Sequence, residues 1–192
     1  MKRVLFYRLG YFLFDKIFYD LANKPMLNFL KYNYNGNSLV GVEIGVRESN
    51  NAERMLNELK NLKMLYLIDP YKDYFDVESN VLERVNIFKG YSLDKLNRNH
   101  VGRFVFVYKT SDNAVNDIPD VLDFVYIDGN HAYDFVKRDI ELFYPKVKFG
   151  GVFGGHDYNC KGVKCAVDNF VKKYGYKLFV CNQDWWIIKK EE

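Results

Sequence analysis

The hydrophobic pattern after residue 38 alternates between short, continuous apolar runs and longer segments with helical spacing. A continuous apolar run is typical of a strand that is covered on both faces, as in parallel sheets between helices. The runs that we expect to be strands are residues 39–46, 63–69, 103–111, 122–128 and 150–157. The pattern therefore predicts an α/β fold built on a mostly parallel sheet.

The segments between these runs carry apolar residues at every third or fourth position, which predicts helices. Residues 50–62 form the first helix, and the mixed region from 70 to about 100 is expected to be helical. A later helix ends or kinks at Pro145, because proline cannot continue the helical hydrogen bonds. Its apolar face consists of Val136, Ile140, Phe143 and Val147.

A last helix and two final strands complete the predicted sheet. Residues 163–174 have amphipathic spacing, and Gly175 stands where a glycine commonly ends a helix. The segments "YKLFVC" and "WWIIKK" follow, joined by the turn residues "NQD". Strands joined by so short a connection pair antiparallel. We therefore expect seven strands, mostly parallel, with an antiparallel C-terminal strand.

Composition narrows the function classes. The chain has 192 residues, of which 48% are hydrophobic and 28% charged, which fits a soluble globular domain. A net charge of +3 without long runs of one sign does not indicate a nucleic-acid partner. The cysteines Cys160, Cys165 and Cys181 are odd in number and never spaced as CxxC. They favour reduced thiols in a cytoplasmic protein over disulfides or a thiolate zinc site.

Residues 1–38 precede the alternating pattern, and we expect a helical N-terminal cap or extension there, followed by one domain over 39–192. The stretch "MKRVLFYRLGYFLFDKIFYDL" is apolar almost all round a helical wheel. Such a helix is expected to be buried against its own domain or in a homo-oligomer. Arg8, Asp15 and Lys16 interrupt the run before the ~18 residues of a membrane span. A helix on a membrane surface is an alternative.

Polar residues stand at the carboxyl ends of the first two strands. In parallel α/β sheets, ligands bind just beyond the carboxyl ends of the strands. Gly45 lets backbone approach a ligand, while Glu43 would repel a pyrophosphate and suit a cationic or ammonium-bearing ligand. The carboxylate of Asp69 is placed to accept both hydroxyls of a ribose. A structural turn at Gly45 and a cap by Asp69 on the turn into Pro70 are the alternatives.

A second group follows the fourth and fifth strands, which should be neighbours, in "FVYIDGNHAY" and "GGHDY". Asp128 and Asp157 could converge on a hard divalent cation. His156 would shift the preference from magnesium towards manganese. His131 has an ordinary pKa near ~6.5 that suits a general base. A hydrogen-bonded structural histidine is the alternative.

The acidic strand end with Gly45, then Asp69, then "FVYIDGNHAYDFVKRDIELFYPKVKFGGVFGGHDY" resembles the class I S-adenosylmethionine-dependent methyltransferases. The branch most similar includes small-molecule and sugar O-methyltransferases. The resemblance covers about residues 39–190 and is most specific over 122–158. It implies a Rossmann-like three-layer α/β/α sandwich, S-adenosylmethionine as cofactor, and a sugar-like small-molecule hydroxyl as acceptor.

The resemblance also implies roles by position. Ser49 stands where the family's first motif has a second glycine, and in metal-dependent relatives the acids after strands four and five bind magnesium. A histidine at the spacing of His131 deprotonates the acceptor in similar sugar O-methyltransferases. The implied cofactor contacts are Glu43, Gly45 and Ser49 at the methionine part, Asp69 at the ribose, Ser111 near the adenine, and Asp128. The implied catalytic residues are His131 and Asp128, and the implied ligands of a Mg or Mn ion are Asp128, His156 and Asp157.

The sequence thus favours an O-methyltransferase, with two alternatives. A catalytically inactive protein that kept the cofactor fold as a binding module is supported by Ser49 in place of glycine. Methyl transfer to nitrogen is weakened because no Asn/Asp-Pro-Pro-aromatic motif follows the fourth strand.

Overall fold

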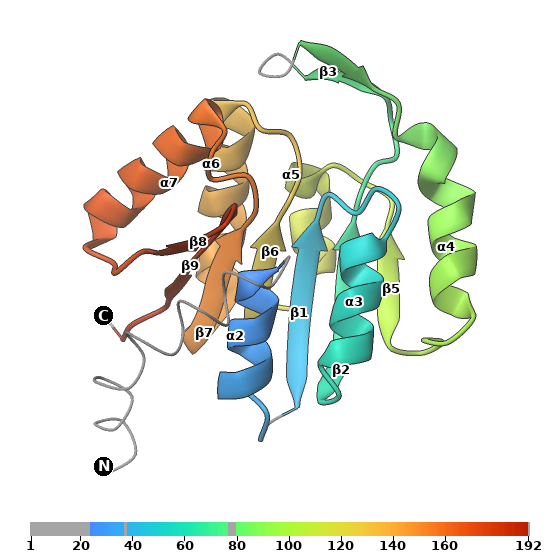
Figure 1. Ribbon diagram of the computed structural model, residues 1–192, viewed down its shortest axis with the longest axis horizontal. Helices are drawn as coiled ribbons and strands as arrows, with labels where there is room; N and C mark the ends of the chain where they lie inside the picture. Colours follow the sequence, from blue (N-terminus) through green and yellow to red (C-terminus); the bar gives the residue numbers. More distant parts are fainter. Residues whose placement is uncertain (1–23, 37, 77–79, 192) are drawn as a thin grey trace.

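The computed structural model describes residues 24–36, 38–76 and 80–191 of the chain (Figure 1). The aromatic N-terminal stretch, with its expected burial or oligomer contact, lies almost wholly outside the described residues. Its role therefore stays a prediction, as does the domain boundary at residue 38. Within the described ranges, no helix has the length and apolar character needed to cross a membrane.

The centre of the molecule is a seven-stranded sheet in the order β5-β2-β1-β6-β7-β9-β8. Five strands run parallel, and β9 pairs antiparallel with both β7 and β8. This confirms the predicted mostly parallel sheet with an antiparallel C-terminal strand. The strands are β1 (Leu39–Ile44), β2 (Leu62–Ile68), β5 (Phe104–Val107), β6 (Leu122–Ile127), β7 (Val147–Gly155), β8 (Phe179–Cys181) and β9 (Asp184–Ile188).

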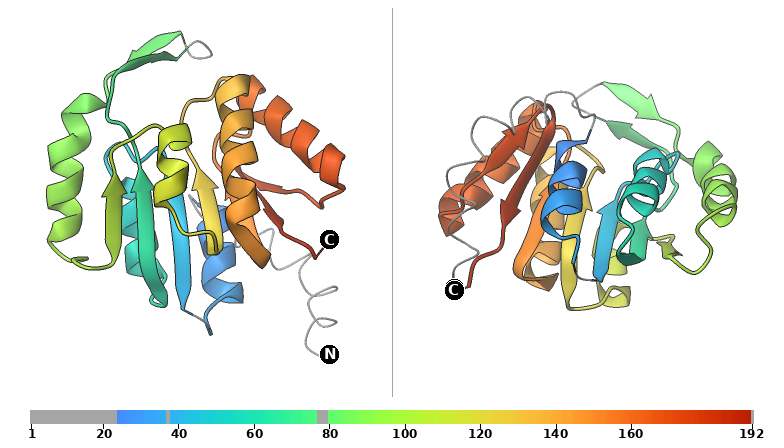
Figure 2. Two further views of the ribbon diagram at one scale, coloured as in Figure 1. Left: turned by 180° about the vertical axis from the view of Figure 1, so that it is seen from behind. Right: turned by 60° about the horizontal axis from the view of Figure 1, so that its bottom comes forward.

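Helices cover both faces of the sheet and complete a three-layer α/β/α sandwich (Figures 1 and 2). One face carries α2 (Pro25–Asn33), α3 (Asn50–Glu58) and α4 (Lys89–Asn97). The other carries α5 (Ser111–Ala114), α6 (Tyr133–Phe143) and α7 (Lys161–Tyr174). Short 3₁₀ turns lie at η2 (Asn86–Phe88), η3 (Val115–Asp117) and η4 (Tyr144–Lys146).

The alternation of side chains along the strands builds two hydrophobic cores, one under each helical layer. Val42 and Val125 face α6 and α7, whereas their neighbours Phe124 and Tyr126 face α2 and α3. All six residues of β6 are buried, which explains the run of four apolar residues, Phe124 to Ile127, that ends the strand. Burial of this kind, at roughly 25 cal/mol per Å² of apolar surface, is the main stabilising contribution to the fold.

The region from 70 to 100 differs from the helical expectation. It contains an antiparallel hairpin of β3 (Tyr74–Asp76) and β4 (Val81–Glu83) before α4 begins. The hairpin extends beyond the main sheet at its carboxyl edge (Figure 1). Its strands have three residues each, and Phe75, Val81 and Leu82 are exposed. So short and exposed a pair leaves no periodic pattern in the sequence, which is why the prediction failed there.

The prediction for the end of α6 was also wrong in one position. Val147 does not continue the helical face but begins β7, after a 3₁₀ turn that contains Pro145. The proline has no N–H to extend the helix, and the chain leaves for the sheet instead. By contrast, Gly175 ends α7 with φ +65, as predicted for a C-cap glycine.

The register of the strands aligns the predicted site residues along one edge. Ile44 pairs with Ile68 on one side and with Ile127 on the other, and Ile127 pairs with Gly155. The residue after each of these strands therefore emerges at the same level. Those residues are Gly45, Asp69, Asp128 and His156.

Candidate active site

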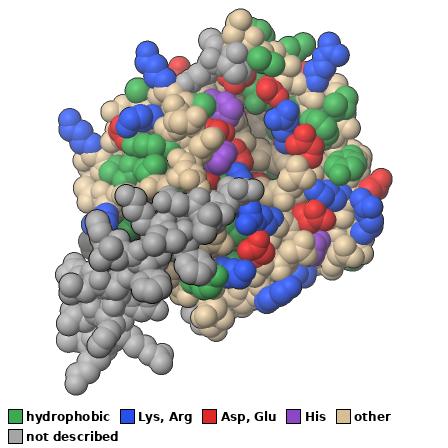
Figure 3. Space-filling model, in the orientation of Figure 1, with side chains coloured by type: hydrophobic (Ala, Val, Ile, Leu, Met, Phe, Trp, Pro, Cys, Tyr) green, Lys and Arg blue, Asp and Glu red, His purple; other side chains and the backbone are tan. Residues whose placement is uncertain are grey.

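A cavity of about 880 Å³ opens at this carboxyl edge. It lies within the ~300–1,000 Å³ that is usual for small-molecule and cofactor sites. In the space-filling view, histidine and acidic side chains gather beside a hollow above the sheet (Figure 3). The lining comes from the ends of β1, β2, β6 and β7, the start of α5, one side of α6, and the β3–β4 hairpin.

Glu43, the fifth residue of β1, is a buried carboxyl on the cavity wall. Its Oε1 accepts a hydrogen bond of 2.9 Å from Asn51 Nδ2 on α3. Its Oε2 and the Oδ1 of Asn51 are both buried and have no hydrogen-bond partner in the described part of the chain. Burial raises the pKa of Glu43 to about 8, and the Asn51 hydrogen bond only partly offsets it. One hydrogen-bonded pair of side chains at the cavity thus carries two oxygen atoms without partners.

Gly45 allows the ends of β1 and β6 to approach closely. It has φ +84, and a Cβ at this position would overlap the backbone carbonyl of Asp128. The contact is reinforced by a 2.7 Å hydrogen bond from Asp128 N–H to the Ile44 carbonyl. A glycine is required here because any side chain would separate the two strand ends.

Asp69 orders the loop that follows β1. Its Oδ2 accepts the backbone N–H groups of Val46 and Arg47, at 2.9 and 3.0 Å, and its Oδ1 accepts that of Tyr71 at 2.7 Å. The capping alternative raised from the sequence is therefore part of its role. Each carboxylate oxygen has two lone pairs, so Oδ1 retains one for a ligand hydroxyl at the cavity.

The two predicted serines differ in position. Ser49 adopts φ +58 before α3 and is fully buried, and it does not line the cavity. Ser111 begins α5 and does line it, beside Asp139 of α6. Burial raises the pKa of Asp139 to about 7, and a hydrogen bond with Ser111 opposes this.

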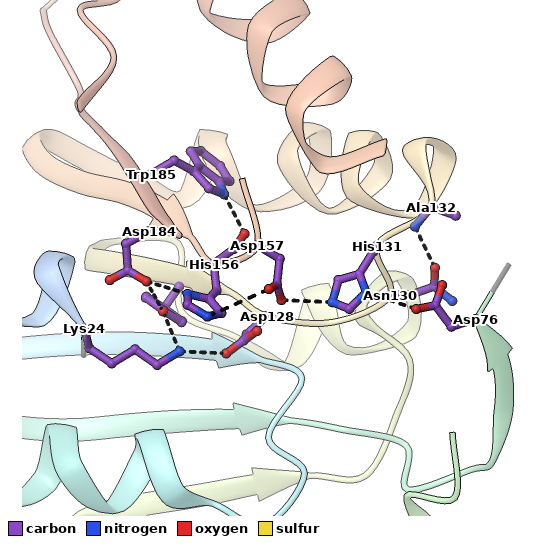
Figure 4. A network of polar contacts seen from close by, with 11 residues as sticks. Lys24, Asp76, Asp128, Asn130, His131, Ala132, His156, Asp157, Asp184 and Trp185 are labelled. Atoms are coloured by element: carbon purple, nitrogen blue, oxygen red, sulfur yellow. Dashed lines mark hydrogen bonds and ion pairs between the residues drawn. The ribbon is translucent and has the colours of Figure 1, made fainter. Parts of the chain in front are cut away.

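His131 lies between two carboxylates (Figure 4). Its Nδ1 is 3.1 Å from Asp76 Oδ2 and its Nε2 is 3.0 Å from Asp157 Oδ2. The loop that carries it is ordered by Asn130, whose Oδ1 accepts the Ala132 N–H at the start of α6. The hydrogen bond with Asp157 is the main cause that raises the pKa of His131 to about 9, with Asp76 adding to it and burial opposing it.

Asp128 faces a lysine that the sequence did not indicate. Lys24 Nζ lies 3.3 Å from Asp128 Oδ2 and donates to Tyr126 Oη at 3.0 Å. Burial raises the pKa of Asp128, and the charge of Lys24 is the largest opposing contribution. Lys24 directly precedes Pro25, the first residue of α2.

His156 is held from behind by a buried acid (Figure 4). Its Nδ1 is 2.7 Å from Asp184 Oδ1, and Asp184 also accepts from Tyr126 Oη at 2.7 Å. Its Nε2 is 3.8 Å from Asp157 Oδ1, and its backbone carbonyl accepts from Trp185 Nε1. Burial lowers the pKa of His156, but Asp184 and the other acids outweigh it and the pKa is raised.

Asp157 therefore has an imidazole on each side. Burial raises its pKa, but the His131 hydrogen bond and the two imidazoles reverse this and hold the pKa below its usual range. No group of three or more His, Cys, Asp or Glu side chains within residues 24–36, 38–76 and 80–191 is arranged to hold a metal ion. The side chains predicted as ligands come to the same edge, but their arrangement does not fit a divalent ion.

Four polar groups of this site escaped the sequence reasoning. Lys24, Asn51, Asp76 and Asp184 come from four different elements and reach the site only through the fold. Asp184 alone gave a signal, since an acid directly before the buried pair of tryptophans must find a partner.

Comparison with known proteins agrees with this geometry. A family model described as a methyltransferase domain matches residues 42–158. The chain is 29% identical over 137 residues to the uncharacterized protein R132 of Acanthamoeba polyphaga mimivirus. That match covers 69% of this chain and 58% of R132, so the chain spans less than two thirds of the length of this curated relative.

Solved structures share the fold at low identity. The O-methyltransferase NovP superposes with a TM-score of 0.66 at 16% identity, covering 86% of this chain and 76% of NovP. MycE, the mycinamycin-pathway methyltransferase in complex with Mg, SAH and mycinamycin VI, gives 0.61 at 14%, covering 87% and 48%. The precorrin-6y C5,15-methyltransferase of Geobacter metallireducens gives 0.61 at 18%, covering 88% of each chain. These likenesses establish the fold but not the acceptor.

Proposed function

The chain belongs to the methyltransferase domain family, with the fold of the class I S-adenosylmethionine-dependent enzymes, and from this premise we propose that it methylates a hydroxyl oxygen of a sugar or another small molecule. The observation that carries the proposal is the division of the cavity into two halves. One half, at β1 and β2, has buried acceptors without partners, and the other, at β6 and β7, has acids and imidazoles in contact.

The first half suits the methionine part of the cofactor. Glu43 Oε2 and Asn51 Oδ1 are buried oxygens of one hydrogen-bonded pair, and an ammonium group supplies the donors that they lack. Unpaired buried acceptors are costly in the free protein, so a ligand that satisfies both gains affinity. Asp69 then receives a ribose hydroxyl on Oδ1, and Ser111 lies on the adenine side. Ser49 contributes through the backbone turn into α3 rather than through its buried side chain.

When bound, S-adenosylmethionine supplies a methyl group whose bond to sulfur breaks, with the electron pair staying on sulfur, as the acceptor oxygen forms its new bond to carbon. His131 removes the proton of the acceptor hydroxyl through Nε2, where Asp157 lies in the free protein. Asp76 stays on Nδ1 and fixes the ring. Displacement of Asp157 also lowers the pKa of the imidazole, so the base becomes available when the acceptor is in place.

Asp128 and Asp157 orient the acceptor by accepting its other hydroxyl hydrogens. A polyol suits this half because its hydroxyl groups can satisfy several carboxylate oxygens together. We also propose that the protein is cytoplasmic and that it forms a homo-oligomer through its N-terminal segment. Residues 39–192 would form the cofactor-binding domain, with 1–38 as its extension.

Calorimetry of S-adenosylmethionine and S-adenosylhomocysteine binding tests the cofactor half. We expect one site with micromolar affinity in the wild type and a loss of at least tenfold in Glu43→Gln. Glu141→Gln, an exposed residue of α6 outside the cavity, is the control. Transfer of an isotopically labelled methyl group to a panel of sugars, catechols and amines then tests the acceptor half. No cofactor binding would refute the proposal, and transfer to amines alone would refute methylation on oxygen.

A further inference from the structure

Lys24 occupies a fixed position at the N-terminus of α2. Pro25 begins the helix, and the N–H of Met26 donates to the fully buried Asp184 at 2.9 Å. Met26, Leu27 and Leu30 are buried in the core between α2, α3 and the sheet. Lys24 is thus held directly beside the carboxyl ends of β6 and β7 (Figure 4).

The ammonium group of Lys24 is mostly buried and directed at the acidic half of the cavity. The side chain is 17% exposed, and Nζ donates to Tyr126 Oη at 3.0 Å and to Asp128 Oδ2 at 3.3 Å. Nζ also lies 5.2 Å from the centre of the Tyr126 ring. An ammonium has three N–H donors. Its two contacts therefore leave one donor for a group that enters the cavity, whose lining includes Lys24.

The same carboxylates are the predicted metal ligands, and each already faces a cation or an imidazole. Asp128 is paired with Lys24, and Asp157 is flanked by His131 at 3.0 Å and His156 at 3.8 Å. In the described parts of the chain, no three His, Cys, Asp or Glu side chains are arranged to hold a metal ion. A divalent ion placed between Asp128 and Asp157 would meet the ammonium at short range and be repelled.

We propose that Lys24 takes the place of a divalent cation: its ammonium neutralises Asp128 and donates to the acceptor oxygen, stabilising the negative charge that develops as the proton leaves. This inference rests on the proposed methyl transfer to oxygen and makes that reaction independent of metal. A preorganised donor aimed at developing charge is the general means by which enzymes stabilise an oxyanion, and one such donor contributes ~10²–10³ in kcat.

Manganese binding tests the first part without an acceptor. Electron paramagnetic resonance of MnCl₂, with and without S-adenosylhomocysteine, should show no stoichiometric binding to the wild type. Lys24→Ala and Lys24→Gln should gain one Mn²⁺ site, which the double variant Lys24→Ala/Asp128→Asn should lose. Lys31→Ala, on the exposed side of the same helix and paired with Glu58, should behave as the wild type.

Manganese binding to the wild type that is lost in Asp128→Asn would overturn the inference. So would the absence of a gained site in folded Lys24→Ala and Lys24→Gln, because the position would then not be one that a metal can take. Cofactor affinity is read separately by calorimetry in the same samples. If the wild type does not bind the cofactor, the proposed function is refuted, whereas the inference that Lys24 occupies the metal position is not.

Turnover tests the second part, with the acceptor found in the labelled-methyl panel. Lys24→Met should lower kcat by about a hundredfold and leave the affinity for S-adenosylhomocysteine within about twofold. Lys24→Arg should recover part of the rate, and a chelator should leave the wild-type rate unchanged. If Lys24→Met melts at a lower temperature but keeps the wild-type kcat, Lys24 only holds α2 in place. That result would refute the catalytic part of the inference.

Discussion

At the scale of single residues, the site shows how burial and partners set the charge of each group. Glu43 is deprived of water and has only one partner, so it is largely neutral near pH 7. His131 has two carboxylates within 3.1 Å and is largely charged. Near pH 7 the carboxyl group of Glu43 is thus largely uncharged and the imidazole of His131 largely charged, the reverse of their usual charges. Shifts of this kind are typical of functional sites.

The raised pKa of Glu43 predicts that cofactor binding is coupled to proton release. A cationic ligand favours the ionised carboxylate, so its binding lowers the pKa of Glu43 from about 8 and expels a proton. Affinity should therefore rise with pH from about 5.5 to about 7.5, below the ~8 at which the ligand's own amine titrates. Calorimetry in buffers of different ionisation enthalpy measures the proton. Glu43→Gln should abolish its release, and an unchanged proton count in this variant would contradict the assignment.

The two carboxylates on His131 predict the pH dependence of catalysis. The imidazole accepts a proton only when it is neutral, so kcat/KM should rise with pH towards the raised pKa of about 9. Asp76→Asn removes one carboxylate and should move this limb to lower pH by about one unit. Asp94→Asn, an exposed residue of α4, is the matched control. A limb that stays in place in Asp76→Asn would show that another group limits the rate.

At the scale of elements, the predictability of each part follows from its burial. Strands β1, β2, β6 and β7 are largely buried, and the sequence shows them as short segments rich in apolar residues. Because parallel strands end at the same edge of the sheet, the sequence could also predict that Asp69 and Asp128 lie together at that edge. The positions of the β3–β4 hairpin and of α2 beside the cavity depend on tertiary contacts between distant segments. The sequence therefore could not predict that Asp76 and Lys24 reach the site.

The junction of α2 with β9 depends on Asp184, which accepts from Met26 N–H, Tyr126 Oη and His156. Asp184→Asn replaces one acceptor by a donor and leaves buried partners unpaired. We expect a loss of about 2–4 kcal/mol in the free energy of unfolding, measured in urea, and weaker holding of Lys24 at the cavity. Asp168→Asn, in an exposed contact with Lys164 on α7, should cost less than about 1 kcal/mol. Equal losses in both variants would deny Asp184 this role.

At the scale of the whole molecule, the fold gathers groups with raised pKa values at one end of the sheet. Glu43, Asp139 and His131 all line one cavity, and each has a pKa raised above its usual value. For a raised pKa, the folded state binds more protons than the unfolded state between the two values. The contribution to stability is therefore full below the unfolded pKa and is lost as pH rises through the folded one.

Each loss runs from the unfolded to the folded pKa, which is 4.5 to about 8 for Glu43, 3.8 to about 7 for Asp139 and 6.5 to about 9 for His131. All three losses therefore overlap between about pH 6.5 and pH 7. The free protein should therefore lose stability from about pH 5 to pH 9, most steeply near pH 7, seen as a falling urea midpoint at constant slope. Glu43→Gln/Asp139→Asn should flatten the curve between about pH 5 and pH 7, because neither replacement titrates, and should leave the His131 contribution up to about pH 9. Saturating S-adenosylhomocysteine should raise the whole curve and flatten the Glu43 contribution, since the ligand favours the ionised form. A midpoint that stays level or rises from pH 5 to pH 9 would contradict the raised pKa values, because groups that titrate as they do in water contribute no pH dependence to stability.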